Sequence, residues 1–598
     1  MLLGSEKGII SKKGKVMKNK IVMSLLGALA LILGAEAGER VKIWPEGLMP
    51  NASPHQIAAM TDEKEKGRDP YLEWFDPPAK PNGTCMILIS GGSYEVCCDV
   101  DLIKMWNERF TAIGCQCVNF VYRTPRPKNL EIWRTAWQDG QRAVRLVRSE
   151  AKKRGFDPEK IGTMSMSAGS HLATLLATSA LTPAYNAVDM LDKVPCHINW
   201  AITGAIAYGV DDGLLGANER GGQAIDAKIT KCFKFDNKTA PMCMFHGGID
   251  IYSPMASTLV YRELRKRNIP AELHLFADRN HGFWGWNPGK ENSTAYDNWF
   301  NQAQEFMVQM GFLGKTEKSV KLMDRYQKDF HDLSKFSKEE IWPKGKTPYF
   351  QEHQCVPYIE WYIPSNLTTK SIQIIYSGGA YWGNDPYGFE VAPFRRYLNE
   401  KGMAVVTLKY RTPRPKGLAK HTSAWADLQR CIRIVRSQAK ERGLNPDRIG
   451  IMGSSAGGHL TLMGATSSRS RAYWYVDKLD SIKCNVQWAV GIYPAYALTD
   501  GIDMHNTTGG NDDSARLVPE FAFDPDTCPM VFIHGDADNW AAMNSVKTWE
   551  QMRRMGIQCD LHTLAKRNHC FQMEAAPGTG SWSWMERIWE FMNHKRVR

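Results

Sequence analysis

Residues 164–173 read MSMSAGSHLA, and residues 452–461 read MGSSAGGHLT. The two stretches lie 288 positions apart and share the form small-x-Ser-x-Gly, which places a serine on a sharp turn between a strand and a helix. A single match of this kind is weak evidence, because short glycine and serine patterns recur by chance. Its repetition at a fixed offset, together with the sequence around it, predicts a duplicated domain.

The repeat extends over most of the chain. Residues 71–74 (YLEW) recur as 358–361 (YIEW), and residues 122–127 (YRTPRP) recur unchanged at 410–415. A charged stretch after residue 315 has no counterpart in the second half. We therefore predict the following organisation: a signal peptide at 1–37, domain 1 at 38–315, a linker at 316–340 and domain 2 at 341–598.

Within each copy, apolar strand-like runs alternate with helical periodicity. In the first copy residues 86–89 and 160–164 read as strands, and residues 137–154 carry apolar side chains at helical spacing. This order predicts an α/β fold with right-handed crossovers, in which a mostly parallel sheet has helices on both faces.

The N-terminus predicts export. Five lysines between residues 12 and 20 precede the apolar run Ile21–Leu33, and Ala35-Glu36-Ala37 forms a small-x-small cleavage site. The alternative is a membrane anchor, but a 13-residue run is shorter than the roughly 20 residues that span a bilayer. We expect a secreted or periplasmic protein that has no membrane segment after cleavage.

The positive net charge of +12 does not indicate a nucleic-acid partner. Arg142, Arg145 and Arg148 recur at helical spacing, which favours a solvated helix face over a binding patch. The 14 cysteines permit disulfides in an exported protein, although Cys85, Cys117 and Cys243 lie in apolar runs typical of a core. No cysteine spacing resembles a zinc ligand set, and we expect neither a metal nor a cofactor.

Each copy also contains an aspartate and a histidine that suit nucleophilic catalysis. In both copies the aspartate follows the motif serine by 83 residues, and the histidine follows the aspartate by another 31. The order Ser, Asp, His is that of the α/β-hydrolase triad. The predicted catalytic residues are Ser167, Asp250 and His281 in domain 1 and Ser455, Asp538 and His569 in domain 2.

The chemistry explains why these residue types occur together. A serine hydroxyl becomes a useful nucleophile when an imidazole takes its proton, and a carboxylate fixes the imidazole tautomer. The tetrahedral oxyanion needs two donors. The predicted donors are the backbone N–H groups after the nucleophile and in the Gly-Gly loop, at Ala168, Gly92 and Ser93 in domain 1 and at Ala456, Gly379 and Ala380 in domain 2.

Other polar residues near these motifs favour structural roles. His171 and His459 follow each serine by four residues on a helix that packs on the sheet. Asp139 and Asp427 are expected to form structural ion pairs with arginines of the repeated Tyr-Arg-Thr-Pro motif.

With these motifs in place, the chain resembles two fused α/β-hydrolase esterases of the acetylxylan/feruloyl esterase-like type. The shared motifs are Trp-Pro at the start, Gly-Gly-x-Tyr, Asp-x-Gln-Arg, Ser-Ala-Gly, His-Gly-x-x-Asp and Asn-His-x-Phe. The resemblance implies an exported carboxylic ester hydrolase that removes acetyl or feruloyl groups from plant polysaccharide such as xylan. It leaves the acyl group, the polysaccharide and the oligomeric state open.

The substrate contacts that we predict are aromatic, because sugars and ferulate both stack on aromatic rings. The candidates follow the oxyanion loops or the triad residues: Tyr94, Trp284, Tyr381, Trp382 and Trp540. They differ between the copies, so we expect the two sites to prefer different esters.

Two departures from the family pattern concern the serine motif of domain 1. Ser165 and Ser170 stand where domain 2 keeps Gly453 and Gly458. We expect both domains to be active, with domain 2 the stronger prediction. The alternatives are a serine peptidase of the prolyl-oligopeptidase kind, or a fold in which one domain has become a non-catalytic carbohydrate-binding or interface module.

Overall fold

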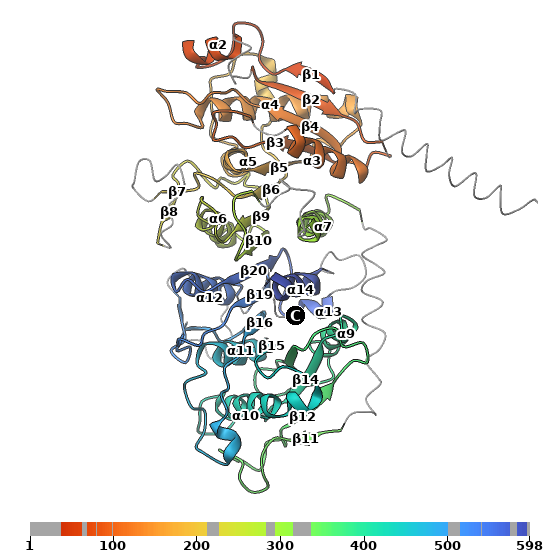
Figure 1. The fold of residues 1–598 in the computed structure, drawn as a ribbon. Coiled ribbons are helices and arrows are strands. Elements are labelled where there is room, and N and C mark those ends of the chain that lie inside the picture. Colours follow the sequence, from red (N-terminus) through yellow and green to blue (C-terminus); the bar gives the residue numbers. More distant parts are fainter. Residues whose placement is uncertain are drawn as a thin grey trace, which may run out of the picture.

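A computed structural model describes residues 38–61, 69–78, 80–97, 100–211, 226–282, 293–314, 337–499, 515–539, 541–574 and 583–594. The predicted signal peptide and most of the predicted linker lie outside these residues. Within the described residues, both halves of the chain contribute to one sheet of 16 strands, which runs through the whole molecule (Figure 1).

Domain 1 contains the first half of this sheet and the helices that cover it. Its elements are β1 (Glu39–Lys42), α2 (Pro54–Thr61), β2 (Tyr71–Phe75), β3 (Cys85–Ile89), α3 (Val100–Ala112), β4 (Gln116–Val121), α4 (Arg134–Arg154), β5 (Ile161–Met166), α5 (Ala168–Thr178), β6 (Trp200–Gly204), β7 (Val210–Asp211), β8 (Lys228–Ile229), β9 (Met242–Gly247), α6 (Met255–Lys266), β10 (Ala271–Phe276) and α7 (Ser293–Gln309).

Domain 2 repeats this order, except that no helix among its described residues corresponds to α2. Its elements are β11 (Glu339–Glu340), β12 (Tyr358–Tyr362), β13 (Ile372–Tyr376), α9 (Ala392–Glu400), β14 (Ala404–Lys409), α10 (Thr422–Gln438), β15 (Ile449–Ser454), α11 (Ala456–Thr466), β16 (Trp488–Ile492), β17 (Leu498–Thr499), β18 (Arg516–Leu517), β19 (Met530–Gly535), α12 (Met543–Arg554), β20 (Cys559–Leu564), α13 (Phe571–Glu574) and α14 (Trp584–His594). The last two residues of the predicted linker form β11, which pairs with β12.

The sheet order runs outward from its middle in the same way on both sides. The order is β1-β2-β4-β3-β5-β6-β9-β10 in domain 1, and it continues as β20-β19-β16-β15-β13-β14-β12-β11 in domain 2. From β4 to β10 all neighbours are parallel, and β10 then meets β20 antiparallel, with His274 opposite His562. The predicted α/β fold is confirmed, and the joining of the two halves into one sheet is a further finding.

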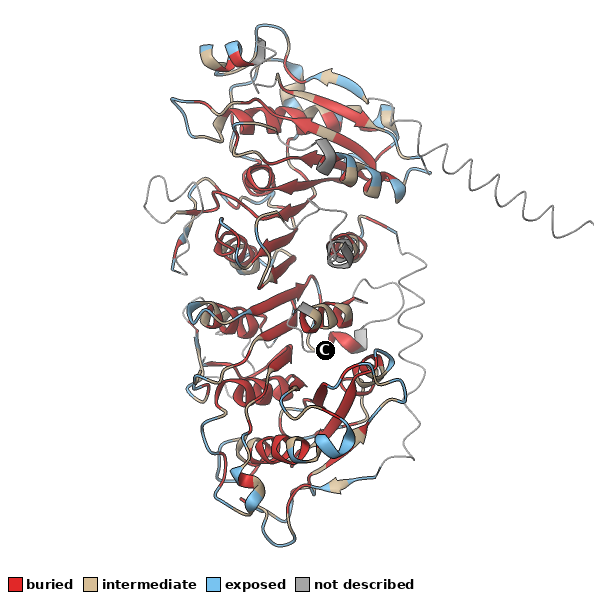
Figure 2. Ribbon diagram, viewed as in Figure 1, coloured by how far each residue is buried: buried red, intermediate tan, exposed pale blue. Residues whose placement is uncertain are grey.

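Alternation along the strands explains why helices lie on both faces. On β3, Met86 and Leu88 join a cluster with Trp106 of α3 and Phe306 of α7. The alternate residue Ile87 joins a second cluster that includes Leu172 of α5. Because neighbouring side chains of a strand point to opposite faces, each face is apolar and each is covered, as the buried strands in Figure 2 show.

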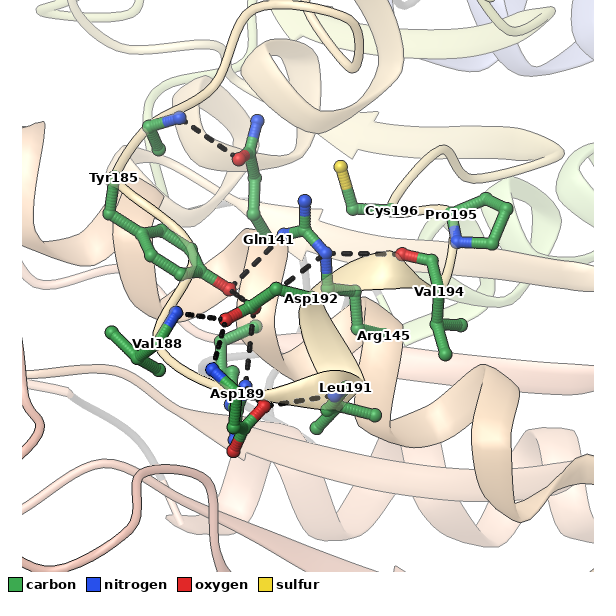
Figure 3. Close-up of polar contacts among 12 residues, drawn as sticks. Gln141, Arg145, Tyr185, Val188, Asp189, Leu191, Asp192, Val194, Pro195 and Cys196 are labelled. Carbon is green, nitrogen blue, oxygen red and sulfur yellow. Dashed lines mark hydrogen bonds and ion pairs between the residues drawn. The ribbon is translucent and has the colours of Figure 1, made fainter.

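The arginines of α4 correct one prediction. Arg142 and Arg148 are buried, and Arg145 is partly buried, so this is not a solvated helix face. Arg145 Nε donates to the Val194 carbonyl at 3.1 Å, and Tyr185 hydrogen-bonds to Asp192 in the same loop (Figure 3). Helical spacing of arginines does not distinguish a helix face that contacts water from one that contacts a polar loop, so the sequence pattern predicted the wrong surroundings.

Among the helices that the structure describes, none combines the length and the apolar character needed to cross a bilayer. Cys85, Cys117 and Cys243 are buried free thiols, so their predicted place in the core is confirmed.

Candidate active site

The motif serines lie at the turn between a central strand and the helix that follows it. Ser167 joins β5 to α5 with φ 57° and ψ −125°, and Ser455 joins β15 to α11 with φ 54° and ψ −120°. A positive φ is strained for a residue with a side chain and is typical of functional turns. Glycines make room for each turn: a Cβ at Gly91 would lie 2.8 Å from Ser167 Cβ, and one at Gly378 would lie 2.6 Å from Ser455 Cβ.

In domain 1 the structure brings the three predicted residues together. His281 Nε2 lies 2.8 Å from Ser167 Oγ, and His281 Nδ1 lies 2.9 Å from Asp250 Oδ1. Asp250 is buried and also accepts a hydrogen bond from the Tyr252 N–H at 2.8 Å, which holds the carboxylate in place. The serine hydroxyl therefore donates toward an imidazole that a buried carboxylate orients.

Domain 2 has the same arrangement. His569 Nε2 lies 2.8 Å from Ser455 Oγ, and His569 Nδ1 lies 2.8 Å from Asp538 Oδ2. Ser455 is 8% exposed and Ser167 is 6% exposed, so both nucleophiles are close to the surface without being open to bulk water. In geometry the two sites are equivalent.

A second histidine lies beneath each carboxylate. His246 Nε2 is 3.6 Å from Asp250 Oδ2, and His534 Nε2 is 3.0 Å from Asp538 Oδ2. Burial lowers the pKa of His246 to about 4 and also lowers that of His534, so both rings are neutral near pH 7. Burial works to raise the pKa of Asp538, but contacts with His534 and His569 outweigh it and hold that pKa below its usual value.

These second histidines were not predicted as functional residues. They are the first residues of the repeated His-Gly-x-x-Asp motif, so the sequence contained a signal for them. The spacing of four residues places the imidazole against the carboxylate once the chain turns after β9 or β19.

The loops after β3 and β13 present bare backbone to the serines. Gly92 has φ 123° and Ser93 has φ 55°, and the equivalent Gly379 and Ala380 have φ 103° and 52°. No described residue accepts a hydrogen bond from the N–H of Gly92, Ser93 or Ala168. The loop and the start of α5 therefore supply unpaired donors of the kind that an oxyanion requires.

Two predicted substrate contacts lie inside the protein. Tyr94 and Tyr381 are fully buried, and their hydroxyls hydrogen-bond to His171 Nδ1 and His459 Nδ1, each at 2.8 Å. Both tyrosines have positive φ, which turns the side chain inward beneath the loop. They brace the loop against the helix after the serine and offer no face to a substrate, and the two histidines have the structural role expected of them.

The other predicted contacts divide between exposed and undescribed positions. Trp382 is 53% exposed and the Arg414 guanidinium lies 4.4 Å from its ring centroid. The equivalent pair in domain 1 is a salt bridge of 2.6 Å between Glu95 and Arg126. Trp284 and Trp540 lie outside the described residues. The rim next to the oxyanion loop is thus aromatic in domain 2 and ionic in domain 1.

A polar network beside the domain 2 triad was not predicted. Glu390 Oε2 accepts a hydrogen bond from the Gly378 N–H at 2.7 Å, and the Tyr493 hydroxyl lies 2.8 Å from Glu390 Oε1 and also contacts Gln572. Burial raises the pKa of Glu390. The corresponding residues in domain 1, Leu102 and Ala205, are apolar. No motif marks this network, because its members come from three distant segments.

The buried ion pairs expected at the Tyr-Arg motifs are present. Arg123 Nη2 lies 2.7 Å from Asp139 Oδ1, and Arg411 Nη2 lies 2.8 Å from Asp427 Oδ1, with all four side chains buried. Each aspartate also accepts from a tryptophan of the Trp-Pro motif, so these carboxylates are committed to structure.

Comparisons with known proteins show which proteins this chain resembles. The chain is 25% identical over 232 residues to an acetylxylan esterase of Xylanibacter ruminicola, a match that covers 37% of this chain and 44% of the relative. It is 28% identical over 224 residues to endo-1,4-beta-xylanase B of Butyrivibrio fibrisolvens, covering 34% of each. The chain therefore spans less than half the length of these relatives.

Among solved structures, the acetyl ester-xyloside bifunctional hydrolase of Caldicellulosiruptor lactoaceticus matches with a TM-score of 0.38 and 22% identity, covering 47% of this chain and 100% of that one. A family model described as BD-FAE matches the chain twice, over residues 74–264 and 359–551, which together exceed half of its length. These matches confirm the esterase-like resemblance predicted from the motifs. The chain belongs, through both of its domains, to the BD-FAE family.

Proposed function

We propose that each domain is a serine carboxylesterase acting through an acyl-enzyme. The observation that carries the proposal is the hydrogen-bonded chain of serine, histidine and buried aspartate, whose distances agree within 0.1 Å between the domains. Ser167 Oγ attacks the ester carbonyl while its proton passes to His281 Nε2. His281 then donates that proton to the leaving alcohol, and a water molecule deprotonated by the same nitrogen releases the acid.

The donors at Ala168 and in the Gly92-Ser93 loop stabilise the oxyanion in this scheme. They are fixed before substrate arrives, because Tyr94 anchors the loop to α5 through His171. Donors that need no reorganisation at the moment of reaction are the ones that lower the barrier most. Ala456, Gly379 and Ala380 have the same role in domain 2.

We propose acylated plant polysaccharide as the substrate class, with acetyl or feruloyl esters of xylan as the first candidates. Two relatives are named for xylan chemistry, an acetylxylan esterase and a xylanase. The exposed Trp382 beside the domain 2 site supports binding of a sugar or an aromatic acyl group by stacking. Export through the N-terminal segment belongs to the same proposal, since the polymer lies outside the cell.

The test uses Ser167→Ala, Ser455→Ala and the double variant of the full chain. Substrates are acetylated xylan, feruloylated oligosaccharides and an aryl acetate. We expect each single variant to keep the activity of the other domain and the double variant to lose at least 10³-fold in kcat, the scale of a lost nucleophile. Different substrate profiles for the two single variants are expected because the rims differ.

The alternatives give different results. If one single variant retains full activity on every ester, the domain that it inactivates is a binding or interface module. If the protein cleaves peptides through Ser167 and Ser455 as nucleophiles and hydrolyses no ester, the alternative of a serine peptidase is correct. Full activity in the double variant would contradict the proposed nucleophiles.

A further inference from the structure

Domain 2 contains a cluster of two imidazoles and one carboxylate that the triad does not use. His459 lies one turn after Ser455 on α11, His421 precedes α10, and Glu520 lies in the loop before β19. His459 Nε2 is 3.3 Å from Glu520 Oε1, and His421 Nδ1 is 3.8 Å from the same oxygen. The three atoms all lie within 4.8 Å of one another.

The nitrogens that face this point are unsatisfied. His459 Nε2 and His421 Nδ1 are buried and have no hydrogen-bond partner among the described residues. His459 is completely buried, and a buried polar atom left without a partner is costly, so such atoms call for an explanation. The nitrogens are close to Glu520 but not aligned to donate to it, which is the arrangement of ligands around a shared centre.

The types of side chain in the cluster suit a cation. Each imidazole offers a ring nitrogen and Glu520 offers a carboxylate oxygen, and these ligand atoms converge on one point. The neighbouring positive charge, on Lys420, lies over the Tyr496 ring, with Nζ 4.3 Å from the ring centroid.

Domain 1 lacks this cluster at the equivalent positions. Trp133 stands in place of His421 and Cys232 in place of Glu520, while His171 corresponds to His459. His171 Nε2 is 3.5 Å from Cys232 Sγ, so its outward nitrogen already has a partner. Two ligand-forming side chains therefore occur in domain 2 alone, at positions where the shared fold requires neither.

We propose that His421, His459 and Glu520 bind one divalent transition-metal ion, with Zn²⁺ as the best match. Two imidazole nitrogens, one carboxylate oxygen and a solvent-filled fourth position form a ligand set that Zn²⁺ accepts. Ligands at bond lengths of about 2.05 Å around a tetrahedral ion are about 3.3–3.4 Å apart, close to the 3.3 Å between His459 and Glu520. Small rotations of His421 and Glu520, both partly exposed, bring in the third ligand.

The ion would stabilise domain 2 and does not take part in ester hydrolysis. His459 Nδ1 is hydrogen-bonded to the Tyr381 hydroxyl at 2.8 Å, which is how an outer-shell partner fixes a ligating imidazole. Tyr381 follows Ala380 in the oxyanion loop. Metal bound at His459 Nε2 would therefore hold this loop against α11, a structural role that goes beyond the proposed esterase activity.

A second set of potential ligands, Cys243, Glu272 and His274, is not proposed as a metal site. It is fully buried in the sheet, and both nitrogens of His274 are already engaged, one by Glu272 at 3.0 Å and one by His562 at 3.1 Å. No nitrogen remains to receive an ion there.

The test measures metal binding by the full chain after chelation and removal of the chelator. Equilibrium dialysis against Zn²⁺, followed by elemental analysis, should give one ion per chain, and Co²⁺ should show the visible absorption of a tetrahedral nitrogen and oxygen site. We expect His421→Trp, which copies domain 1, and Glu520→Gln each to raise the dissociation constant at least tenfold. Tyr381→Phe should raise it by about 10- to 100-fold. The matched control is Cys232→Ser, at the position of Glu520 in domain 1, which should bind as the parent does.

Thermal unfolding gives a second readout that is independent of activity. Zn²⁺ should raise the Tm of the parent and of Cys232→Ser by mass action, and it should leave the Tm of His421→Trp unchanged. The proposal is overturned if the parent binds no stoichiometric ion, or if His421→Trp and Glu520→Gln bind as tightly as the parent does. These results hold whether or not the esterase assignment survives.

Discussion

At the scale of single residues, Ser165 and Ser170 of the domain 1 motif form hydrogen bonds with the groups around them. Ser165 Oγ donates to the Ile202 carbonyl at 3.1 Å and lies 3.2 Å from Ser170 Oγ. Ser170 Oγ in turn donates to the Gly204 carbonyl at 2.8 Å. The exchange of glycine for serine therefore ties the turn to β6 by hydrogen bonds and leaves the Ser167 geometry equal to that of Ser455.

Domain 2 cannot accept the same exchange. A Cβ at Gly453 would lie 2.3 Å from the Gly457 carbonyl oxygen and 2.6 Å from the Tyr376 ring. We expect Gly453→Ser to lower the free energy of unfolding by about 1–3 kcal/mol through overpacking, and to reduce the domain 2 kcat/KM measured in a Ser167→Ala background. Urea unfolding and aryl acetate hydrolysis measure the two effects.

The reverse change serves as the matched control. Ser165→Gly should cost about 1 kcal/mol, because it adds backbone freedom and removes hydrogen bonds without creating a clash. Its domain 1 activity, measured in a Ser455→Ala background, should stay close to the parent value. Equal effects of the two exchanges would show that the surroundings of the turn do not distinguish the domains.

At the scale of elements, strands β10 and β20 bury ionisable groups where the two domains meet. Glu272 of β10 lies 3.0 Å from His274 Nε2 and accepts the Ala565 N–H at 3.0 Å. Burial raises the pKa of Glu272 to about 7 and lowers the pKa of His274 and of His562 well below the usual value. The strand pair is therefore built around neutral imidazoles and a carboxyl group that keeps its proton in acid, up to about pH 7.

This arrangement predicts how stability depends on pH. Because the folded pKa of Glu272 lies above its unfolded value, its contribution is complete below about pH 4.5 and is lost as pH rises to about 7. Relative to Glu272→Gln, the parent should lose up to about 1.4 kcal/mol per pH unit across that window, the slope for one proton. Urea unfolding of both proteins between pH 4.5 and 8 gives the difference, and a constant difference would contradict the assignment.

Elements and triads could be predicted from the sequence because their signals are local or repeated. The strands, α4 and α10 follow from periodicity, and each triad follows from two equal spacings. The pairing of β10 with β20 could not be predicted. An edge strand that is buried by a partner strand has the same apolar sequence pattern as a central strand. The same limit applies to Glu390 and His421, which gain their roles from neighbours far along the chain, and to Tyr381, whose direction depends on a positive φ.

At the scale of the whole molecule, the two domains meet like the subunits of a two-fold dimer. His274 faces His562, and these residues occupy the same position in the two copies, 288 residues apart. Arg262 of α6 and Glu550 of α12 are also equivalent positions, and their side chains form an ion pair of 2.9 Å. In a symmetric pair of identical domains position 262 would face itself, so Arg262 would meet a second arginine.

The ion pair therefore favours contact of domain 1 with domain 2 over contact of either domain with its own kind. Both side chains are mostly buried, at 13% and 6% exposure, so reversing one charge places two like charges together at a desolvated contact. We expect Arg262→Glu and Glu550→Arg each to lower the free energy of unfolding of the full chain by about 2–5 kcal/mol. The double variant, which exchanges the two charges, should recover most of that loss. Denaturant unfolding of the four proteins forms a double-mutant cycle, and additive single effects would show that the pair does not contribute to the choice of partner.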